Sequence, residues 1–403
     1  MASYASESSA SIARLAADRR VHQAFQWLHL QEQRILQWQT ELVRIPAPPF
    51  GEGPRAEWVC ARFRELELED AQIDEVGNAL ATRRGTDAGR RRVLLSAHID
   101  TIFPAGTLIE PVLRGSRLAA PGACDNGAGV AAMLALAAAM RDAGIRTACD
   151  VVFAGNVGEE GEGDLRGMRH LYRDGADSVE AQIALDGAGD ASAVMQALGS
   201  QRWRVTVRGP GGHAWTDAGR PNPIAILSRA IQQFSETALP DTPRTTVNVG
   251  TIAGGTAINA IPEEATASFD LRSTDREQLI RLEVELHRAV EDAALAAANG
   301  EHPDAIGLRW SVEKIGDRPA GKLAADAKLL ELLRAVDRHL GIRTEPRVAS
   351  TDANIPLSLG VPAVSVGAGG TAGGIHTHAE WYDAHGRELA LRRILLLVLA
   401  LAG

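Results

Sequence analysis

The chain has 403 residues, of which 45% are hydrophobic and 23% are charged, and its formal net charge is -9. This length predicts two domains, and a moderate acidic charge without a Lys/Arg-rich run argues against nucleic-acid binding. The composition is typical of a soluble globular protein, and the apolar runs fall short of the ~18 residues that a membrane helix needs.

The N-terminal twenty residues mix small, acidic and basic side chains and lack the apolar centre of a secretion signal. Cys60, Cys124 and Cys149 are widely spaced and form no CxxC pair, which fits a reducing compartment. We therefore expect a cytoplasmic protein without a membrane partner.

Apolar residues at helical spacing predict a helix through residues 1–45, and the proline-rich segment Pro46–Gly51 ends it. A second helix is expected around Arg55–Leu68. Farther along the chain, short apolar runs predict buried parallel strands, and an Ala/Leu/Met-rich run predicts a helix at Gly127–Arg141. The strand candidates are Val93–Ala97, Val151–Val157, Ala181–Leu185 and Pro362–Val366. This alternation predicts an α/β fold with a mostly parallel sheet flanked by helices.

The middle of the chain, residues 200–316, has the order βαββαβ, which is the ferredoxin-like arrangement. We expect it to form an inserted domain, with residues 1–199 and 317–403 forming the larger domain around it. Hinges are expected near Leu198–Gln201 and Gly316–Lys322. The predicted elements are the strand Gln201–Arg208, the helix Pro223–Thr237, the strands Thr245–Ile252 and Glu264–Arg272, the helix Asp275–Ala298 and the strand Gly307–Ile315.

Side chains of the metal-binding types follow the predicted buried strands. Open α/β sheets bind ligands beyond the carboxyl ends of their strands, so these side chains are expected at one edge of the sheet. The groups that follow strands are His98-Ile-Asp100, Glu159-Glu160, Asp186 and the segment His376-Thr-His378-Ala-Glu380, while Asp125 precedes the helix that begins at Gly127.

Each of these groups also has an ordinary structural explanation. His98 can be a hydrogen-bonded buried histidine, Asp125 a helix cap, and Glu159-Glu160 a solvated acidic loop. Their expected convergence on one sheet edge favours a shared metal site over separate structural roles. Two imidazoles and three carboxylates suit zinc, with manganese or cobalt as alternatives, and one carboxylate beyond the needs of a single ion suggests two ions ~3.5–4 Å apart.

Several stretches of the sequence resemble the di-zinc exopeptidase family that includes peptidase T, glutamate carboxypeptidase and acetylornithine deacetylase. The resemblance runs from about Ile35 to the end of the chain. The matching stretches are Ser96–Pro104, Gly122–Gly129, Val157–Gly161, Gly209–His213, Gly254–Pro262 and His376–Glu380.

The resemblance implies a lid or dimerisation role for the inserted domain and a specific set of metal ligands. His376 rather than His378 matches the family ligand. The implied ligands are His98 and Asp186 for one ion, Glu160 and His376 for the other, and Asp125 as the bridge between them.

The resemblance also implies roles for residues around the ions. Glu159 would be the general base and acid, and Asp100 would orient His98. The peptide bond after the bridging Asp125 is often cis in relatives. Many relatives have an Asp or a Lys where this chain has Asn126, which keeps a polar group without its charge.

Three residues of the inserted domain match substrate-binding groups of the family. His213 would stabilise the oxyanion from across a homodimer, and Asn259 and Arg272 would hold the oxyanion or a substrate carboxylate. The ordinary alternatives are a surface histidine for His213 and a salt bridge for Arg272.

The resemblance therefore predicts an amide hydrolase with a short peptide or an N-acylated amino acid as its substrate. Asp186, rather than Glu, favours an aminopeptidase, tripeptidase or dipeptidase. An N-acyl-amino-acid amidohydrolase or a carboxypeptidase is the alternative. A non-catalytic binding protein on the same fold is a third possibility, which the complete ligand set disfavours.

Overall fold

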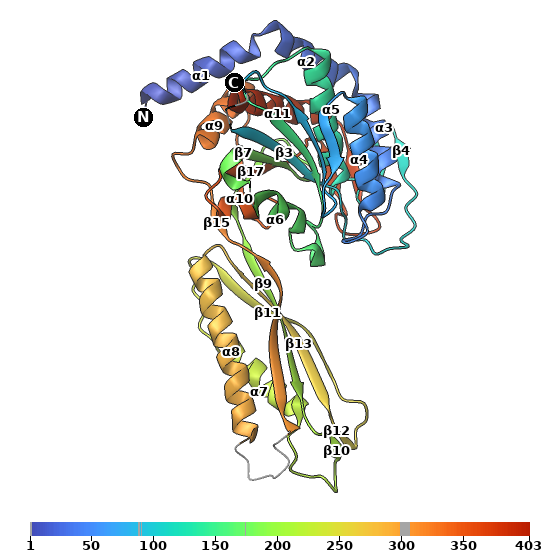
Figure 1. The fold of residues 1–403 in the computed structure, drawn as a ribbon, viewed down its shortest axis with the longest axis vertical. Coiled ribbons are helices and arrows are strands. Elements are labelled where there is room, and N and C mark those ends of the chain that lie inside the picture. Colours follow the sequence, from blue (N-terminus) through green and yellow to red (C-terminus); the bar gives the residue numbers. More distant parts are fainter. Residues whose placement is uncertain (1, 88, 90, 174, 299–306) are drawn as a thin grey trace. The chain divides into compact units, whose positions relative to one another are not determined.

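The computed structural model describes residues 2–87, 89, 91–173, 175–298 and 307–403, and the chain divides into two compact units (Figure 1). The larger unit contains Met1–Ala197 and Lys322–Gly403, and the smaller contains Leu198–Gly321. Each unit has its own buried apolar cluster. The expected limits of the insertion, residues 200 and 316, lie just inside the smaller unit.

The main sheet has the strand order β1-β2-β6-β3-β7-β17-β8-β15, with β15 at Gly321–Lys322, and β16 also pairs with β8. Strands β6, β3, β7 and β17 run parallel at its centre. Their side chains are almost all buried, because helices cover both faces of the sheet. The strands are β1 (Glu69–Ile73), β2 (Ala79–Arg83), β3 (Arg92–His98), β6 (Val151–Asn156), β7 (Val179–Leu185), β8 (Ser192–Ala197), β16 (Glu345–Ala349) and β17 (Ala363–Val366).

Helix α5 (Gly127–Asp142) is the central helix of the larger unit. It is buried on every side from Gly127 to Met140, as expected of a helix that is apolar all round. The opposite face of the sheet has a separate apolar cluster under α6 and α10 that includes Leu94, Val152 and Met168. The remaining helices are α1 (Ala2–Ala16), α2 (Arg19–Leu30), α3 (Glu32–Val43), α4 (Gly53–Glu65), α6 (Arg166–Arg173), α9 (Lys328–Leu340), α10 (Asn354–Ser358) and α11 (Arg387–Ala402).

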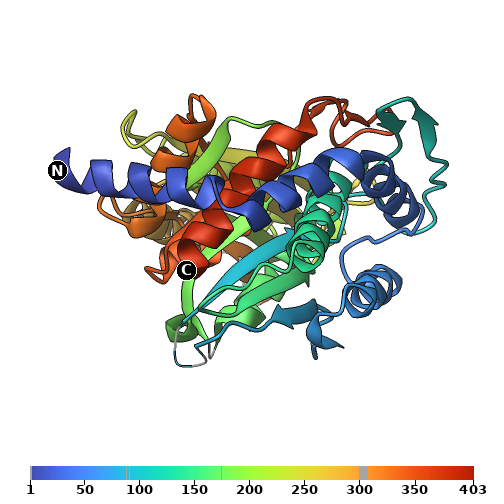
Figure 2. The same cartoon turned by 90° about the horizontal axis from the view of Figure 1, so that it is seen from above.

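The single helix expected over residues 1–45 is wrong, because the structure has three helices there. The side chain of Asp18 accepts hydrogen bonds from the N–H groups of Arg20 and Val21, at 2.7 and 3.3 Å, and so starts α2. An aspartate that caps a new helix competes with continuation of the previous one. Figure 2 shows α1 lying beside the C-terminal helix α11.

A small antiparallel sheet, with the order β18-β19-β5-β4, completes the larger unit. It joins the loop before Asp125 to the segment after His376 through the pairing of Trp381 with Ala119. Its strands are β4 (Val112–Arg114), β5 (Arg117–Ala119), β18 (Thr371–Gly373) and β19 (Trp381–Asp383), and the short β15 (Gly321–Lys322) spans the sequence junction of the two units.

The smaller unit is an antiparallel sheet with the order β11-β13-β9-β14, and α7 and α8 pack on it. Burial alternates along β13, so the sheet has one apolar face and one wetter face. A separate two-stranded ribbon joins β10 to β12. The elements are β9 (Gly199–Arg208), β10 (Gly212–His213), α7 (Pro223–Ser235), β11 (Thr245–Gly254), β12 (Ala260–Ile261), β13 (Glu264–Ser273), α8 (Arg276–Ala298) and β14 (Arg309–Arg318).

The predicted fold class is confirmed: a mostly parallel sheet flanked by helices accompanies a separate antiparallel sheet with its own helices. In the part of the chain that the structure describes, no helix combines the length and the apolar character needed to cross a bilayer.

A buried ion pair joins the C-terminal helix to α9. Arg393 binds both carboxylate oxygens of Asp337, at 2.6 and 2.8 Å, and also donates to the carbonyls of Asp190 and Ser192. Removing the arginine leaves a buried unpaired charge. We therefore expect Arg393→Ala to lower the free energy of unfolding by about 3–5 kcal/mol, measured by denaturant titration.

The matched control is Arg347→Ala, which removes an exposed arginine that pairs with Glu345 at 2.9 Å. Exposed pairs are worth about 0–1 kcal/mol, so the control should unfold close to the parent. Equal decreases in the free energy of unfolding for the two variants would show that the buried Arg393–Asp337 pair stabilises the fold no more than an exposed pair does.

Candidate metal centre

The carboxyl ends of the parallel strands carry the candidate ligands. His98 is the last residue of β3, Asp186 directly follows β7, and Glu160 follows β6 after a short loop. Asp125 lies just before α5, in the loop after β5. Because adjacent parallel strands end at the same edge of a sheet, these side chains meet there although they are far apart in sequence.

Asp125 lies between the two imidazoles. Its Oδ1 is 3.1 Å from His98 Nε2, and its Oδ2 is 2.9 Å from His376 Nε2. Asp186 Oδ1 is 3.8 Å from His98 Nε2, and Glu160 Oε1 is 3.2 Å from His376 Nε2. Each imidazole thus shares Asp125 and has one further carboxylate, the pairing that the two-ion assignment requires.

The donor set fits divalent cations. Ligand atoms of His98, Asp125 and Glu160 all lie within 4.8 Å of one another. The Oδ1 atom of Asp125 is buried and has no hydrogen-bond partner in spite of its closeness to His98. A buried anionic oxygen without a hydrogen bond is costly in a protein, and a cation relieves that cost. Nitrogen and oxygen ligands in this number suit zinc, manganese or cobalt.

The carboxylates perturb one another. Burial, and then the negative charge of Asp125, raise the pKa of Glu160 to about 7. Burial opposes ionisation of Asp125 as well, but the hydrogen bond from His376 and the positive charges of His98 and His376 hold its pKa below the usual range. The hydrogen bond to Asp125 raises the pKa of His376 to about 9 against the smaller effect of burial. Near neutral pH, His376 therefore holds a proton in the metal-free protein.

Asp100 organises two of the ligand segments. The Nδ1 atom of His98 lies 3.2 Å from the main-chain oxygen of Asp100 and 3.5 Å from its Oδ1, which directs Nε2 toward Asp125. The carboxylate accepts hydrogen bonds from the N–H groups of Glu159 and Glu160, at 3.0 and 2.7 Å. The sequence predicted only the orientation of His98, and the structure adds the anchoring of the glutamate loop.

Glu380 is a residue whose contribution the sequence did not reveal. Its carboxylate accepts hydrogen bonds from the backbone N–H groups of Gly122, Cys124 and Asp125, at 3.1, 2.8 and 2.9 Å. These bonds join the loop that carries His376 to the loop that carries Asp125. Its place in the His376–Glu380 match was a signal, but spacing alone does not show a bond to a distant backbone.

The side chain of Asn126 joins two segments of the site, a role that the sequence did not predict. Its side chain caps α5 by accepting from Gly129 N at 3.1 Å, and it donates to the carbonyl of Leu185 at 2.8 Å. This second bond anchors the segment that presents Asp186. A side chain at position 129 would lie 2.3 Å from the Asn126 oxygen, so glycine is required there. The Asp125–Asn126 peptide bond is cis.

Glu159 and His378 flank the ligand cluster. Glu159 is 6% exposed, and the hydrogen bond from its N–H to Asp100 positions it. The ring of His378 packs against Phe103 with centroids 5.6 Å apart, which supports His376 as the ligand of this loop. Burial raises the pKa of the Cys124 thiol far above its usual range, so this neighbour of Asp125 stays protonated.

Asp352 is a second residue that the sequence did not reveal. It is 3% exposed, and its Oδ2 accepts a hydrogen bond from Asn156 at 2.8 Å. Asn156 pairs with His98 in the β3–β6 ladder, so this carboxyl lies behind the ligand strand. Burial raises the pKa of Asp352 to about 7. Asp352 lies just before α10 and belongs to none of the motifs that the sequence analysis singled out.

The predicted substrate-binding residues of the smaller unit fall into two groups. Ala214 N donates to the carbonyl of Asn259 at 2.9 Å, which brings Asn259 beside His213 at the β10–β12 ribbon. Arg272 pairs with Ser200 at the opposite end of the sheet, about 25 Å away by strand length. It forms an ion pair with Asp270 at 2.7 Å on a central strand. One copy of the unit does not bring Arg272 together with the other two.

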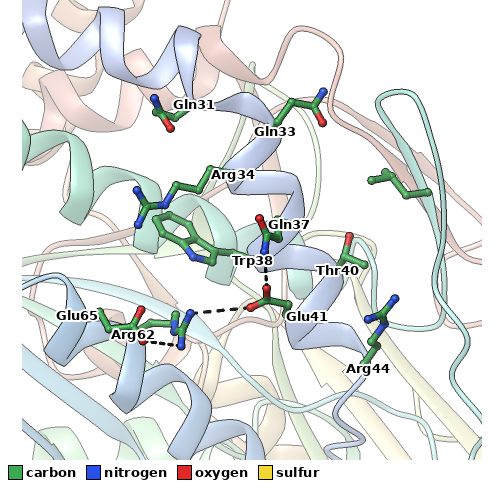
Figure 3. Close-up of a pocket in the computed structure, with 11 residues that line it drawn as sticks. Gln31, Gln33, Arg34, Gln37, Trp38, Thr40, Glu41, Arg44, Arg62 and Glu65 are labelled. Atoms are coloured by element: carbon green, nitrogen blue, oxygen red, sulfur yellow. Dashed lines mark hydrogen bonds and ion pairs between the residues drawn. The ribbon is translucent and has the colours of Figure 1, made fainter.

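A hollow of about 870 Å³ lies on the larger unit between α3 and α4 (Figure 3). Its charged groups form pairs, since Arg62 lies 2.6 Å from Glu65 and 4.0 Å from Glu41, and Gln37 donates to Glu41 at 2.9 Å. Arg34 covers the ring of Trp38. These side chains come from helix surfaces rather than strand ends, and they form a paired polar surface.

Glu380→Ala tests the anchoring of the Asp125 loop. We expect it to weaken Zn²⁺ binding by about 10- to 100-fold, because loss of a group that orients a ligand lets that ligand move. Isothermal calorimetry measures the change. Glu57→Ala, at an exposed position of α4, is the control and should bind like the parent. Unchanged affinity in Glu380→Ala would remove the anchoring role.

Cation binding should depend on pH with a defined sign. Cations bind neutral imidazoles and ionised carboxylates, whereas below pH about 9 His376 and below pH about 7 Glu160 hold protons in the metal-free protein. The affinity for Zn²⁺ should therefore rise between pH 6 and 8, by roughly tenfold per pH unit for each displaced proton. Calorimetry in buffers of different ionisation enthalpy measures the released protons, and a pH-independent affinity would contradict the assignment.

Comparisons with known proteins give relatives in sequence and in fold. The chain is 25% identical over 366 residues to the uncharacterized protein YqjE of Bacillus subtilis, covering 87% of this chain and 94% of that protein. It is 26% identical over 321 residues to acetylornithine deacetylase of Myxococcus xanthus, covering 70% of this chain and 81% of that protein. In fold it is similar to aminopeptidase PepT of Bacillus cereus, with a TM-score of 0.74 and 22% identity. The match covers 92% of this chain and 99% of that structure.

The model of peptidase family M20/M25/M40 matches residues 94–400, a range that contains all five candidate ligands. The resemblance seen in the sequence motifs is therefore confirmed over most of the chain. On this match, the chain belongs to peptidase family M20/M25/M40.

Proposed function

We propose that this protein is a two-cation exopeptidase that cleaves an amide bond of a short peptide. The observation that carries the proposal is Asp125, which lies between His98 and His376 with one further carboxylate beside each imidazole. A single carboxylate shared by two half-sites is the arrangement for two ions, for which zinc is the first candidate and manganese or cobalt the alternatives.

The residues of the chain divide the reaction between them. Divalent cations held by these ligands would polarise the substrate carbonyl and make a water acidic near neutral pH. Glu159 takes the proton of the attacking water and passes it to the leaving nitrogen. Asp100 holds the backbone of Glu159 and directs His98, so the base and the ligands keep a fixed spacing.

The substrate class follows from the ligand types and the relatives. Carboxypeptidases and deacetylases of this family tend to have glutamate at the position of Asp186. The aspartate here therefore favours a tripeptidase or dipeptidase. The similar fold of aminopeptidase PepT supports this choice. The second candidate is an N-acyl-amino-acid amidohydrolase, which the relative named acetylornithine deacetylase favours. The cytoplasmic location expected from the sequence stays a prediction.

The smaller unit is proposed as a lid and dimer contact. Strand β11 is ten residues long, lies at the edge of its sheet and carries mostly exposed or half-buried side chains, including Ile252 at 59% exposure. Such an edge can pair with a second copy. His213 and Asn259 would then serve the centre of the partner copy. Arg272, at the other end of the sheet, would contact a substrate carboxylate, as the family resemblance implies.

The hydrogen bonds of His213 define its tautomer. Its Nδ1 accepts from the N–H groups of Trp215 and Thr216, at 3.2 and 3.5 Å. The proton of the neutral ring is therefore on Nε2, which is free to donate to an oxyanion. The exposed position of His213 is what a group that acts on another copy requires.

Glu159→Ala tests the proposed base. We expect Zn²⁺ binding within about twofold of the parent and a fall in tripeptide turnover of at least 10²- to 10⁴-fold, because only proton transfer is lost. Calorimetry and release of the terminal amino acid measure the two quantities. Glu162→Ala, in the same loop and exposed, is the control. Unchanged turnover in Glu159→Ala would reject the base, and turnover of N-acyl amino acids without tripeptides would favour the second candidate.

Mixing two inactive variants tests the shared site. Glu159→Ala lacks the base and His213→Ala lacks the donor, so a mixed dimer contains one centre with both groups intact. Random exchange of subunits should restore about a quarter of the parental activity. Light scattering follows the dimer. An active monomer, or no recovery after demonstrated exchange, would show that His213 does not act across subunits.

A further inference from the structure

Two large apolar side chains protrude beside the proposed oxyanion donor. Trp215 is 84% exposed and Ile258 is 104% exposed, the highest values among the large hydrophobic residues that the structure describes. Burial of a side chain of this size stabilises a fold by about 1.5–3 kcal/mol. Neither residue makes this contribution within its own unit, because both are exposed. Single exposed apolar residues are ordinary, but two of them next in sequence to the ends of one backbone ribbon indicate a contact surface.

The β10–β12 ribbon brings the two side chains to the same end of the unit. His213 pairs with Ala260, and Ala214 N donates to the carbonyl of Asn259. Trp215 is the residue after Ala214, and Ile258 is the residue before Asn259. The apolar pair therefore flanks the polar pair His213 and Asn259.

The turn that carries Trp215 is held in place before any substrate binds. His213 N donates to Asp217 Oδ2 at 2.7 Å, and Asp217 N donates back to the carbonyl of His213 at 2.9 Å. Arg220 in turn lies 3.2 Å from Asp217 Oδ1. The N–H of Trp215 is bonded to the imidazole of His213 itself. These bonds fix the backbone of Trp215 next to His213, so the indole is attached at a defined point beside any group that His213 meets.

The charges of this turn leave an apolar contact surface. Asp217 and Arg220 pair with each other, so neither presents an isolated charge beside His213. Trp215 and Ile258 are the large apolar side chains exposed there, beside small residues and Thr216 and Thr256. An aromatic ring there can bury a large area of a substrate side chain, whereas a charged side chain would lose its hydration without a partner.

We propose that Trp215 and Ile258 contact the substrate side chain next to the scissile amide and select apolar and aromatic residues at that position. The inference rests on the proposed function, in which His213 Nε2 meets the oxyanion of the peptide. Trp215 is two residues from His213 and its N–H is bonded to that imidazole, so a substrate side chain beside the oxyanion comes within reach of the indole. The chain is then a peptidase for hydrophobic short peptides rather than for charged ones.

The test measures kcat/KM of the metal-loaded protein on tripeptides that differ only beside the scissile bond, with Gly, Ala, Leu, Phe or Glu there. The parent should prefer Phe and Leu over Gly and Glu. Trp215→Ala should lower the Phe-to-Gly ratio of kcat/KM by about 10- to 200-fold, and Ile258→Ala by a smaller factor. Trp215→Phe should keep most of the ratio. Val284→Ala, which removes an exposed apolar side chain of α8, should keep all of it.

Other results would overturn the inference. A uniform loss on every peptide in Trp215→Ala, with the Phe-to-Gly ratio unchanged, would assign a purely structural role to the indole. Dissociation of the dimer at an unchanged ratio, seen by light scattering, would assign the apolar pair to the contact between copies. A parent that binds two cations but hydrolyses none of the peptides would remove the proposed function, and the inference with it.

Discussion

Acidic side chains crowded at a buried sheet edge are the constraint on which the larger unit depends. Asp125, Glu160 and Asp186 converge on two imidazoles, and Asp352 lies behind them. Burial and mutual repulsion oppose their common ionisation, as the raised pKa of Glu160 shows. Positive charge is needed to hold them together. Protons supply part of it in the metal-free protein, and divalent cations would supply it in the active one.

Backbone anchoring makes this crowding tolerable. Asp100 binds the N–H groups of the Glu159–Glu160 loop, and Glu380 binds three N–H groups of the Gly122–Asp125 loop. Hydrogen bonds to an ionised carboxylate are stronger than neutral ones, so each anchor fixes a whole ligand segment. In the smaller unit, a backbone N–H likewise fixes His213. Its Nδ1 accepts a hydrogen bond from Trp215 N, which leaves Nε2 as the atom that donates. Ligands and donor are thus preorganised by groups that do not react.

Much of the architecture could be predicted from the sequence because periodicity and strand ends are local signals. The apolar runs that became β3, β6, β7 and β17, and the βαββαβ order of the smaller unit, are patterns within short windows. The ligand candidates followed from position. His98, Glu160 and Asp186 lie at strand ends or soon after them, Asp125 precedes a helix, and His376 lies in the loop region after β17. The single helix over residues 1–45 was wrong because a capping aspartate, Asp18, interrupts a continuous apolar pattern.

The sequence by itself determined the fold class, the separate middle segment and the identity of the metal-type side chains. Only the tertiary structure decided that Asp125 lies between His98 and His376, that Glu380 and Asp352 support the site, and that Arg272 is remote from His213. The physical reason is that these relations join residues from separate strands and loops, and their geometry depends on strand order and register. Local propensity acts over a few residues and contains no information about such pairings.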